Sequence, residues 1–256
     1  MEISEIQHDS WKQDGWLALR GSIDEQALGV LHEAIDKIES WAHTGGPGMH
    51  HFEMTDNGPA LARSERFADD HTALGSFLRS GLVTDVLAQL FGEPAALFKE
   101  KVNYKQPGGA GFAPHQDAAA YRFVDHHISV MVPLDDATIE SGCLWFAPGH
   151  NAGKLDTDER GRLTERVVDD LKWQPIEVQP GDLVAFDSYA PHHSETNKSP
   201  HPRRALYLTY NAASLGDFRD RYYADKDAEF AAGGNEFESG SPRISISDDF
   251  LGRPVS

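Results

Sequence analysis

The sequence has very little cysteine, since Cys143 is the single one among 256 residues. One thiol excludes a disulfide within the chain and any zinc site built from several cysteines. Long hydrophobic runs are also missing, because no stretch approaches the roughly 20 apolar residues of a membrane-spanning helix. The N-terminal segment lacks a basic stretch followed by an apolar one, so we expect no signal peptide. We therefore predict a protein of a reducing aqueous compartment, the cytoplasm.

Basic residues are scarce as well. Lysine and arginine number 23 against 41 acidic residues, which gives a formal net charge of −18. Such a surface repels phosphate backbones and anionic lipid headgroups, so we expect neither nucleic acid nor a membrane as a partner. A small anionic substrate stays compatible with this charge, because a pocket can be locally basic. Composition leaves the oligomeric state open.

The N-terminal part of the chain, residues 1–95, is expected to be mainly helical. Ser22 and Glu25 form a capping-box pattern, and the apolar residues that follow at helical spacing predict a helix over 23–42. A second helical pattern precedes the first predicted strand. The polar segment 50–70 between these two patterns is expected to be a loop.

Short segments rich in β-branched and aromatic residues follow, each bounded by glycine, proline, asparagine or aspartate. This spacing predicts an antiparallel sandwich or barrel over residues 96–214. We expect its strands at 96–104, 127–134, 142–147, 175–178, 182–186 and 204–210. The charged insert 155–172 is expected to form one amphipathic helix. Residues 215–256 are polar and glycine-rich, which predicts a weakly packed C-terminal extension of a single domain, 1–256.

Two places in the chain could supply metal ligands. His115 and Asp117 are two residues apart, so their side chains project to the same side of an extended segment. Further on, a predicted strand ends in a turn that presents His192 or His193. Two imidazoles and one carboxylate on one face leave three coordination positions open, which is typical of non-haem Fe(II) oxygenases. Zinc instead prefers four tetrahedral ligands.

Two further histidine pairs, His50–His51 and His126–His127, are adjacent in the sequence. Neighbouring residues of a strand point to opposite faces, so each pair can turn at most one member inward. Which of them lines a pocket is left open by the sequence.

Arg203 adds a positive charge to the candidate metal site. It follows His192 by eleven residues, with a turn between them that can bring the chain back alongside. A guanidinium at this place suits bidentate binding of a carboxylate. A cosubstrate that chelates iron at one end and needs a positive partner at the other is 2-oxoglutarate. The alternative is that Arg203 and Arg204 form an ordinary solvated basic pair.

The set His115-Gln-Asp117, His192-His-Ser-Glu-Thr-Asn197 and Arg203 resembles the phytanoyl-CoA dioxygenase family of Fe(II)/2-oxoglutarate oxygenases. The resemblance covers about residues 98–211. It implies a mainly β fold, the double-stranded β-helix or jelly-roll barrel, with N-terminal helices packed on it and iron inside one open end. It also selects His192 over His193 as the third ligand, assigns 2-oxoglutarate binding to Arg203, and implies O₂ as the second cosubstrate.

The same resemblance implies further roles. Asn103 and Gln116 are expected to contact the cosubstrate, or else to be ordinary polar residues near the barrel mouth. Asp117 favours hydroxylation, because family members that halogenate lack this carboxylate.

Segment 98–121 is similar to bacterial members that hydroxylate 2-aminoethylphosphonate and its N-trimethylated form. On this resemblance, Tyr121 and Phe123 are expected to receive an ammonium group through cation–π contacts. Lys101 or Arg122 is expected to bind the phosphonate. The alternative is core packing for the two aromatic residues and a solvated surface for the two charges.

Three other functions stay open at this point. The enzyme could hydroxylate another small metabolite or an acyl-CoA. A jelly-roll barrel can also be a ligand-binding protein without catalysis, because fold does not determine function. A zinc hydrolase on the same ligands would not need Arg203. Substrate-dependent conversion of 2-oxoglutarate to succinate separates these functions.

Overall fold

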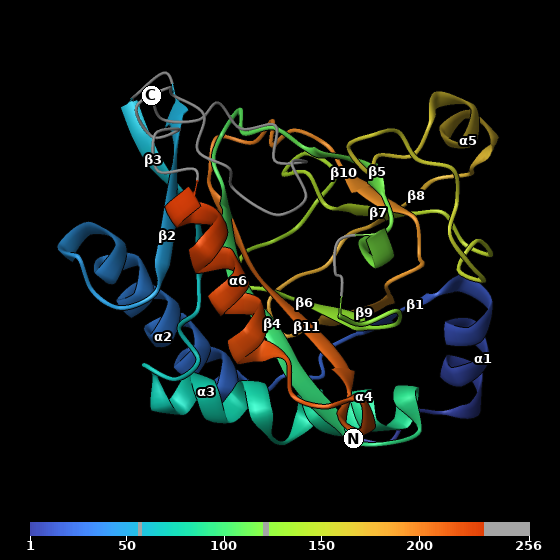
Figure 1. Cartoon of the computed structure of the whole chain (residues 1–256), viewed down its shortest axis with the longest axis horizontal. Coiled ribbons are helices and arrows are strands. Elements are labelled where there is room, and N and C mark those ends of the chain that lie inside the picture. The colour runs from blue at the N-terminus through green and yellow to red at the C-terminus, as the bar shows by residue number, and fades with distance from the viewer. Residues whose placement is uncertain (56–57, 120–122, 233–256) are drawn as a thin grey trace.

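Two antiparallel sheets form the centre of the computed structural model, which describes residues 1–55, 58–119 and 123–232 (Figure 1). The larger, seven-stranded sheet contains, in spatial order, β1 (Trp16–Leu19), β9 (Leu183–Asp187), β6 (Ile128–Pro133), β11 (Arg203–Ala212), β4 (Ala95–Lys105), β3 (Gly58–Glu65) and β2 (Met49–Thr55). The smaller, four-stranded sheet contains β5 (Phe112–His115), β10 (His192–Ser194), β7 (Leu144–Phe146) and β8 (Gln174–Ile176). The two sheets form a double-stranded β-helix, as the sequence predicts.

The larger sheet has two different faces, because successive side chains of a strand alternate. One face packs against the N-terminal helices through residues such as Val102, Leu206 and Leu208, which belong to the main hydrophobic core. The opposite face, here called the interior face, is turned toward the smaller sheet. Met131 and Phe186 of the interior face pack there against Phe146 and other residues of β7 and β8, forming a second core. The interior of the barrel lies between these two sheets.

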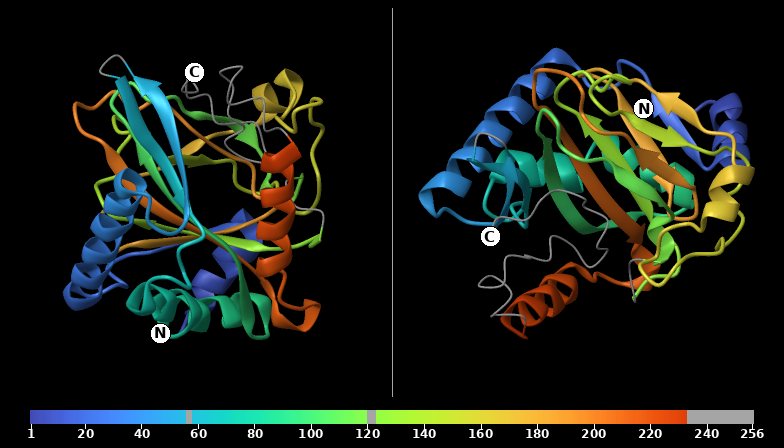
Figure 2. Two further views of the ribbon diagram at one scale, coloured as in Figure 1. Left: turned by 60° about the vertical axis from the view of Figure 1, so that its left-hand side comes forward. Right: turned by 90° about the horizontal axis from the view of Figure 1, so that it is seen from above.

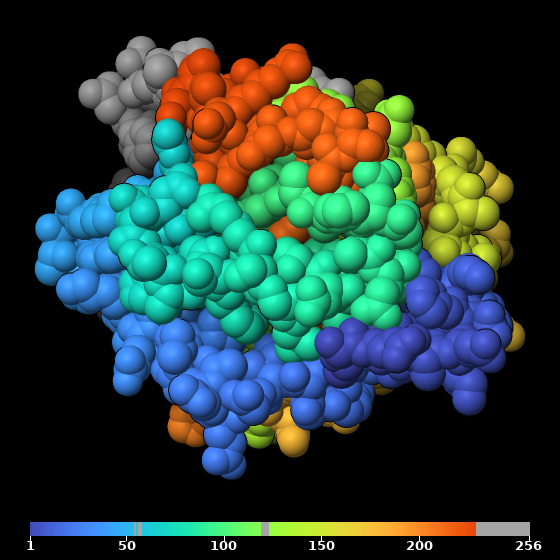
Figure 3. Space-filling model, turned by 90° about the horizontal axis from the view of Figure 1, so that it is seen from below, coloured from blue at the N-terminus to red at the C-terminus, as the bar shows by residue number. Residues whose placement is uncertain are grey.

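The helices lie outside the barrel. They are α1 (Glu5–Asp14), α2 (Glu25–Thr44), α3 (Thr72–Arg79), α4 (Leu82–Phe91), α5 (Glu165–Asp170) and α6 (Arg219–Ala232), with short 3₁₀ turns at Asp117–Ala119 and Ala213–Leu215. Figure 3 shows α3 and α4 forming a continuous band between the N-terminal segment (blue) and the C-terminal helix (orange). Each helix of the described ranges is too short or too polar to cross a lipid bilayer.

The predicted helices are found with shifted ends. The helix expected over 23–42 is α2, and its N-cap is Asp24, whose carboxylate accepts a hydrogen bond from the Ala27 amide at 2.8 Å. Ser22 therefore does not cap it. The insert 155–172 forms only the six-residue α5 rather than one long amphipathic helix.

The polar segment 50–70 was expected to be a loop, and this expectation is wrong. Residues 49–65 form the hairpin β2–β3, which pairs with β4 and extends the larger sheet (Figure 2). Its sequence shows no alternation of apolar and polar residues, because its interior face itself carries charged side chains. Those on β3 are Arg63 and Glu65, which are 1% and 0% exposed.

The C-terminal part is packed more firmly than the sequence suggests. Helix α6 runs alongside β4, as Figure 1 shows. Tyr222, Tyr223 and Lys226 are at most 2% exposed, and the Tyr223 hydroxyl donates a hydrogen bond to the Glu100 carbonyl at 3.1 Å. Residues 219–228 thus complete the barrel surface, while 233–256 lie outside the described residues.

Candidate active site

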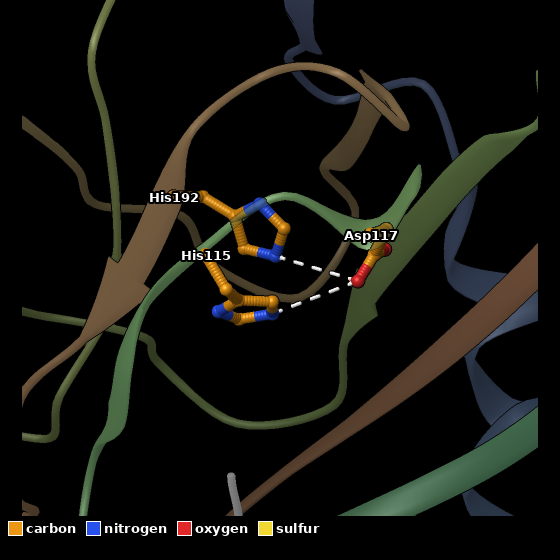
Figure 4. A group of neighbouring side chains, drawn as sticks. All are labelled: His115, Asp117 and His192. Carbon is orange, nitrogen blue, oxygen red and sulfur yellow. Dashed lines mark ion pairs between the residues drawn. The ribbon is translucent and has the colours of Figure 1, made fainter. Parts of the chain in front are cut away.

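His115, Asp117 and His192 converge inside the open end of the barrel (Figure 4). Their candidate ligand atoms lie within 4.8 Å of one another. Strand pairing brings the two histidines together, because His192 of β10 lies opposite His115 of β5. Their Nε2 atoms lie 3.9 Å and 3.6 Å from the same carboxylate oxygen of Asp117. Three donors on one side of a small space fit an octahedral ion with open positions.

Hydrogen bonds hold each of these side chains in a ligand orientation. The His115 Nδ1–H donates to the Ala113 carbonyl at 2.7 Å, and the His192 Nδ1–H donates to the Ala190 carbonyl at 3.0 Å. Both bonds leave Nε2 as the unprotonated nitrogen that faces the site. A hydrogen bond from Nδ1–H to a neighbouring carbonyl thus fixes the tautomer in which Nε2 can bind a metal. The Ser129 hydroxyl donates to the second oxygen of Asp117 at 2.8 Å.

The charge states of these residues also suit a cation. Burial opposes ionisation of Asp117, but the adjacent side chains of His115 and His192 hold its pKa well below its usual range. Burial and the neighbouring His115 lower the pKa of His192 to about 4. At neutral pH the site therefore offers the Asp117 carboxylate and the neutral imidazole of His192, the forms that bind metal.

Arg203 lies at the same end of the barrel with unused donors. It is 2% exposed, and its Nε and Nη1 have no hydrogen-bond partner among the described residues. Lys105, its partner across the strand pair, is tied to Gly142 and Glu195 carbonyls and to the Ser194 hydroxyl. A buried guanidinium with orphaned donors fits the distal carboxylate of 2-oxoglutarate, because an unpaired buried charge is costly.

The other two predicted cosubstrate contacts are already engaged. Asn103 accepts a hydrogen bond from the Arg63 Nε at 3.1 Å. The Gln116 amide donates to the carbonyls of Gly153 and Tyr189, and its oxygen accepts from the Leu155 amide. Gln116 therefore ties the ligand segment to two neighbouring loops. The cosubstrate roles of both residues stay predictions.

The other histidines of the adjacent pairs differ in whether they are buried or turned outward. His193 points away from the ligand set and stacks on Trp145, with ring centroids 5.8 Å apart. His127 is 1% exposed, whereas His126 turns outward and its Nε2 lies 2.7 Å from the Asp187 carboxylate. In the other pair His51 is buried on the interior face, and His50 lies beside the Ser64 hydroxyl.

The predicted substrate contacts lie in different places. Tyr121 and Arg122 fall outside the described residues. Phe123 stacks on Phe218, and the Arg221 guanidinium lies 4.3 Å from the centre of its ring. Lys101 is on the interior face, and its Nζ lies 5.4 Å from the ring centre of Tyr207 and 6.0 Å from that of Phe112, which is on β5. Lys101 therefore reaches toward the strand that carries His115.

Sequence reasoning missed an accumulation of positive charge around Lys101. Four basic residues, here called the interior basic cluster, gather on or against the interior face: Arg63, Lys99, Lys101 and Lys226. The Glu65 carboxylate pairs with two members of the cluster, at 3.4 Å from Arg63 and 2.5 Å from Lys226. Burial together with Arg63 and Lys99 lowers the pKa of Lys101 well below its usual range.

Comparisons with known proteins agree with this geometry. The model of the Phytanoyl-CoA dioxygenase (PhyH) family matches residues 11–205. The chain is 42% identical to the methylphosphonate hydroxylase of Gimesia maris, over 99% of this chain and 97% of that protein. It is 37% identical to the 2-aminoethylphosphonate dioxygenase of the uncultured bacterium HF130_AEPn_1, over 99% of this chain and 98% of that protein.

Solved structures share the fold. The crystal structure of EctD from S. alaskensis with 2-oxoglutarate and 5-hydroxyectoine superposes with a TM-score of 0.71 at 21% identity, covering 83% of this chain and 77% of that one. The barrel and its site define an Fe(II)/2-oxoglutarate-dependent dioxygenase, an oxidoreductase that uses O₂. The chain belongs to the phytanoyl-CoA dioxygenase family.

Proposed function

We propose that this enzyme hydroxylates an aliphatic C–H bond of a small aminoalkylphosphonate. His115, Asp117 and His192 would hold Fe(II), and Arg203 would hold the distal carboxylate of 2-oxoglutarate. The near full-length relatives act on phosphonates by name, methylphosphonate in one case and 2-aminoethylphosphonate in the other. A small molecule is thus the partner that this family membership supports.

Bound iron and 2-oxoglutarate supply the oxidising chemistry when O₂ is present. The residues of the chain supply orientation and exclusion of water. The carbonyls of Ala113 and Ala190 keep the two imidazoles in the ligating tautomer, and Ser129 keeps the Asp117 carboxylate in place. The aromatic rings of Phe146 and Phe186 lie 5.7 Å and 4.9 Å from that of His192 and keep its far side dry.

One observation carries the phosphonate assignment, namely the interior basic cluster. Lys101 has aromatic rings around its ammonium group, and no described carboxylate lies within ion-pair distance of it. Burial and the crowding of Arg63 and Lys99 lower the pKa of the Lys101 amine, and a bound anion would restore its charged form. A phosphonate carries up to two negative charges and three acceptor oxygens, so it suits this cluster better than a carboxylate does.

The test is a turnover screen with Fe(II), 2-oxoglutarate and O₂. Candidate substrates are 2-aminoethylphosphonate, its N-trimethyl form, methylphosphonate and phytanoyl-CoA. We expect succinate release and a hydroxylated product by mass from at least one phosphonate, and none from the thioester. Asp117→Ala enzyme is the control for succinate formed without the metal site. Turnover of the thioester, with every phosphonate inert, would contradict the assignment.

A further inference from the structure

Gln116 lies between two of the candidate iron ligands in the chain, and its side chain is 3% exposed. Its Nε2 donates hydrogen bonds to the Tyr189 carbonyl at 2.6 Å and to the Gly153 carbonyl at 3.0 Å. Its Oε1 accepts a hydrogen bond from the Leu155 amide at 2.8 Å. A glutamine side chain has two N–H donors, so both donors of Gln116 are engaged with backbone groups of the protein.

These bonds direct the Gln116 side chain away from the candidate metal site. Its neighbours His115 and Asp117 turn their ligand atoms toward one another. Successive residues of an extended segment point to opposite sides, so the residue between two ligands faces the other way. Gln116 therefore acts on the ligand-bearing segment from behind.

The bond from Gln116 to Tyr189 joins the two parts of the chain that carry the candidate ligands. Tyr189 lies in the turn that leads into β10, which carries the third ligand. A second bond runs beside it, because the Ala118 amide donates to the Ser188 carbonyl at 2.8 Å. Asp117 is thus held between two residues that bond to consecutive carbonyls of the other ligand-bearing segment.

The bonds from Gln116 to residues 153–155 fasten the beginning of the charged insert to the same segment. Further along the insert, the Leu163 amide donates to the Pro114 carbonyl at 2.8 Å. Pro114 belongs to β5, the edge strand of the smaller sheet, and precedes Gln116 by two residues. The stretch 153–163 is therefore attached at both of its ends to the segment that carries two candidate ligands.

We propose that Gln116 is a positioning residue for iron binding, because it fixes the separation between the segment of His115 and Asp117 and the turn that leads to His192. This inference rests on the ligand set of the proposed function. A metal binds tightly when outer contacts hold its ligands in place before it arrives. Loss of the Gln116 amide removes no ligand, but it releases the two segments from one another. This role differs from the cosubstrate contact that the family resemblance implies.

The chain offers a matched control for Gln116. Gln89 on α4 makes the same three kinds of bonds, since its Nε2 donates to the Met1 and Asp85 carbonyls at 2.9 Å and its Oε1 accepts from the Ile3 amide at 2.8 Å. These bonds attach the N-terminal residues to a helix outside the barrel. Methionine at either position keeps the length of the side chain and removes its three hydrogen bonds.

The experiment titrates anaerobic apoprotein with Fe(II) and records the visible absorption of the Co(II)-loaded protein. Gln116→Met should weaken Fe(II) binding about 10- to 100-fold, which is the usual effect of removing an outer partner of metal ligands. It should also shift the Co(II) bands, because the ligand field depends on where the donor atoms lie. Gln89→Met should keep the wild-type affinity and spectrum, even if its thermal midpoint falls.

Two further variants guard against a Gln116→Met protein that does not fold. Gln116→Glu keeps an acceptor for the Leu155 amide but directs a carboxylate at two carbonyl oxygens, so it should lose at least as much Fe(II) affinity. Gln116→Asn keeps the amide on a side chain one methylene shorter, which cannot reach both neighbouring segments. It should also bind Fe(II) more weakly than the wild type.

Other outcomes would overturn the inference. Unchanged Fe(II) affinity and an unchanged Co(II) spectrum in folded Gln116 variants would refute it. A raised KM for 2-oxoglutarate with intact Fe(II) affinity would make Gln116 a cosubstrate contact instead. Equal losses in Gln116→Met and Gln89→Met would reduce its role to general stability. Full Fe(II) affinity in Asp117→Ala protein would refute the proposed ligand set, and this inference with it.

Discussion

Arg203 and Arg204 are adjacent in β11 and point to opposite faces of the larger sheet. Arg203 is 2% exposed inside the barrel. The Arg204 Nε and Nη2 donate to the two oxygens of Asp135 at 3.0 Å, and its Nη1 donates to Asp36 at 3.0 Å on the outer side. Two arginines that look equivalent in the sequence therefore differ in what they can bind.

Arg203→Ala should raise the KM for 2-oxoglutarate strongly and leave Fe(II) affinity unchanged. Loss of one partner of a buried charge pair costs roughly 2–5 kcal/mol, or on the order of 30- to 4000-fold in affinity. Arg204→Ala should leave this KM unchanged and reduce stability slightly, since surface ion pairs contribute about 1 kcal/mol or less. Steady-state kinetics at varied 2-oxoglutarate concentration measures this KM. Equal effects of the two variants would contradict the assignment of 2-oxoglutarate binding to Arg203.

Alanine at His115, Asp117 or His192 should abolish turnover and weaken Fe(II) binding, because each change removes one ligand of the proposed set. His193→Ala is the matched control. Its ring stacks on Trp145 and meets Trp173 edge to face, away from the ligand set, so Fe(II) binding should persist. Titration of anaerobic apoprotein with Fe(II) measures both. An active His192→Ala enzyme with an inactive His193→Ala enzyme would reverse the assignment.

Ser129→Ala should weaken Fe(II) binding about 10- to 100-fold, which is the usual effect of removing an outer partner of a metal ligand. The hydroxyl of Ser129 donates to the Asp117 oxygen that is turned away from the histidines. Ser129→Thr keeps the hydroxyl and should recover most of the affinity. Full affinity in the alanine variant would show that Asp117 is oriented by other contacts.

Lys101→Met should raise the KM for a phosphonate substrate roughly 30-fold or more, because it removes the amino group that is proposed to pair with the phosphonate. The KM for 2-oxoglutarate should stay near the wild-type value. Lys37→Met, on the exposed face of α2, is the control for a lost lysine as such. A Lys101→Met enzyme with unchanged kinetics would place the phosphonate elsewhere.

His51 should make the fold less stable in acid. Burial lowers its pKa from 6.5 to about 4. Between these values the unfolded chain binds a proton that the folded chain does not, so the free energy of unfolding falls as the pH drops through this window. At about pH 5 the loss attributable to His51 is about 2 kcal/mol. Urea denaturation at neutral pH and at about pH 5 should show a smaller loss for His51→Gln, and identical losses would exclude this role.

Strands β4, β6, β7, β8, β9 and β11 and the residues of the candidate ligand set were accessible from the sequence, whereas the short strands β1, β5 and β10 were not. Strands such as β4, β6 and β11 carry one apolar face against the helices, so β-branched and aromatic residues mark them. His115 and Asp117 share a short segment, and the turn around His192 carries its own pattern. The roles of these residues stay predictions, but the structure brings all of them, with Arg203, to one end of the barrel.

The charged residues that are buried on the interior face could not be predicted from the sequence in the same way. Apolar periodicity is the main sign of a strand, and the hairpin β2–β3 lacks it because His51, Glu53, Arg63 and Glu65 are buried on one side. The sequence nevertheless carried an indication of these strands, because His51 and Glu53, and likewise Arg63 and Glu65, are two residues apart. Helix α6 was not predicted because its sequence is polar. Hydrophobic contacts and buried ion pairs, such as that of Lys226 with Glu65, pack it against the barrel.

The docking of α6 also sets an order of assembly during synthesis. The carboxylate of Glu65 and the guanidinium of Arg63 leave the ribosome early, the three candidate iron ligands follow, and Lys226 comes last. Glu65 is fully buried in the folded chain, where the Lys226 ammonium of α6 pairs with it. A gene fragment ending near residue 214 would therefore encode every candidate ligand and every described strand, but not the helix whose lysine pairs with Glu65.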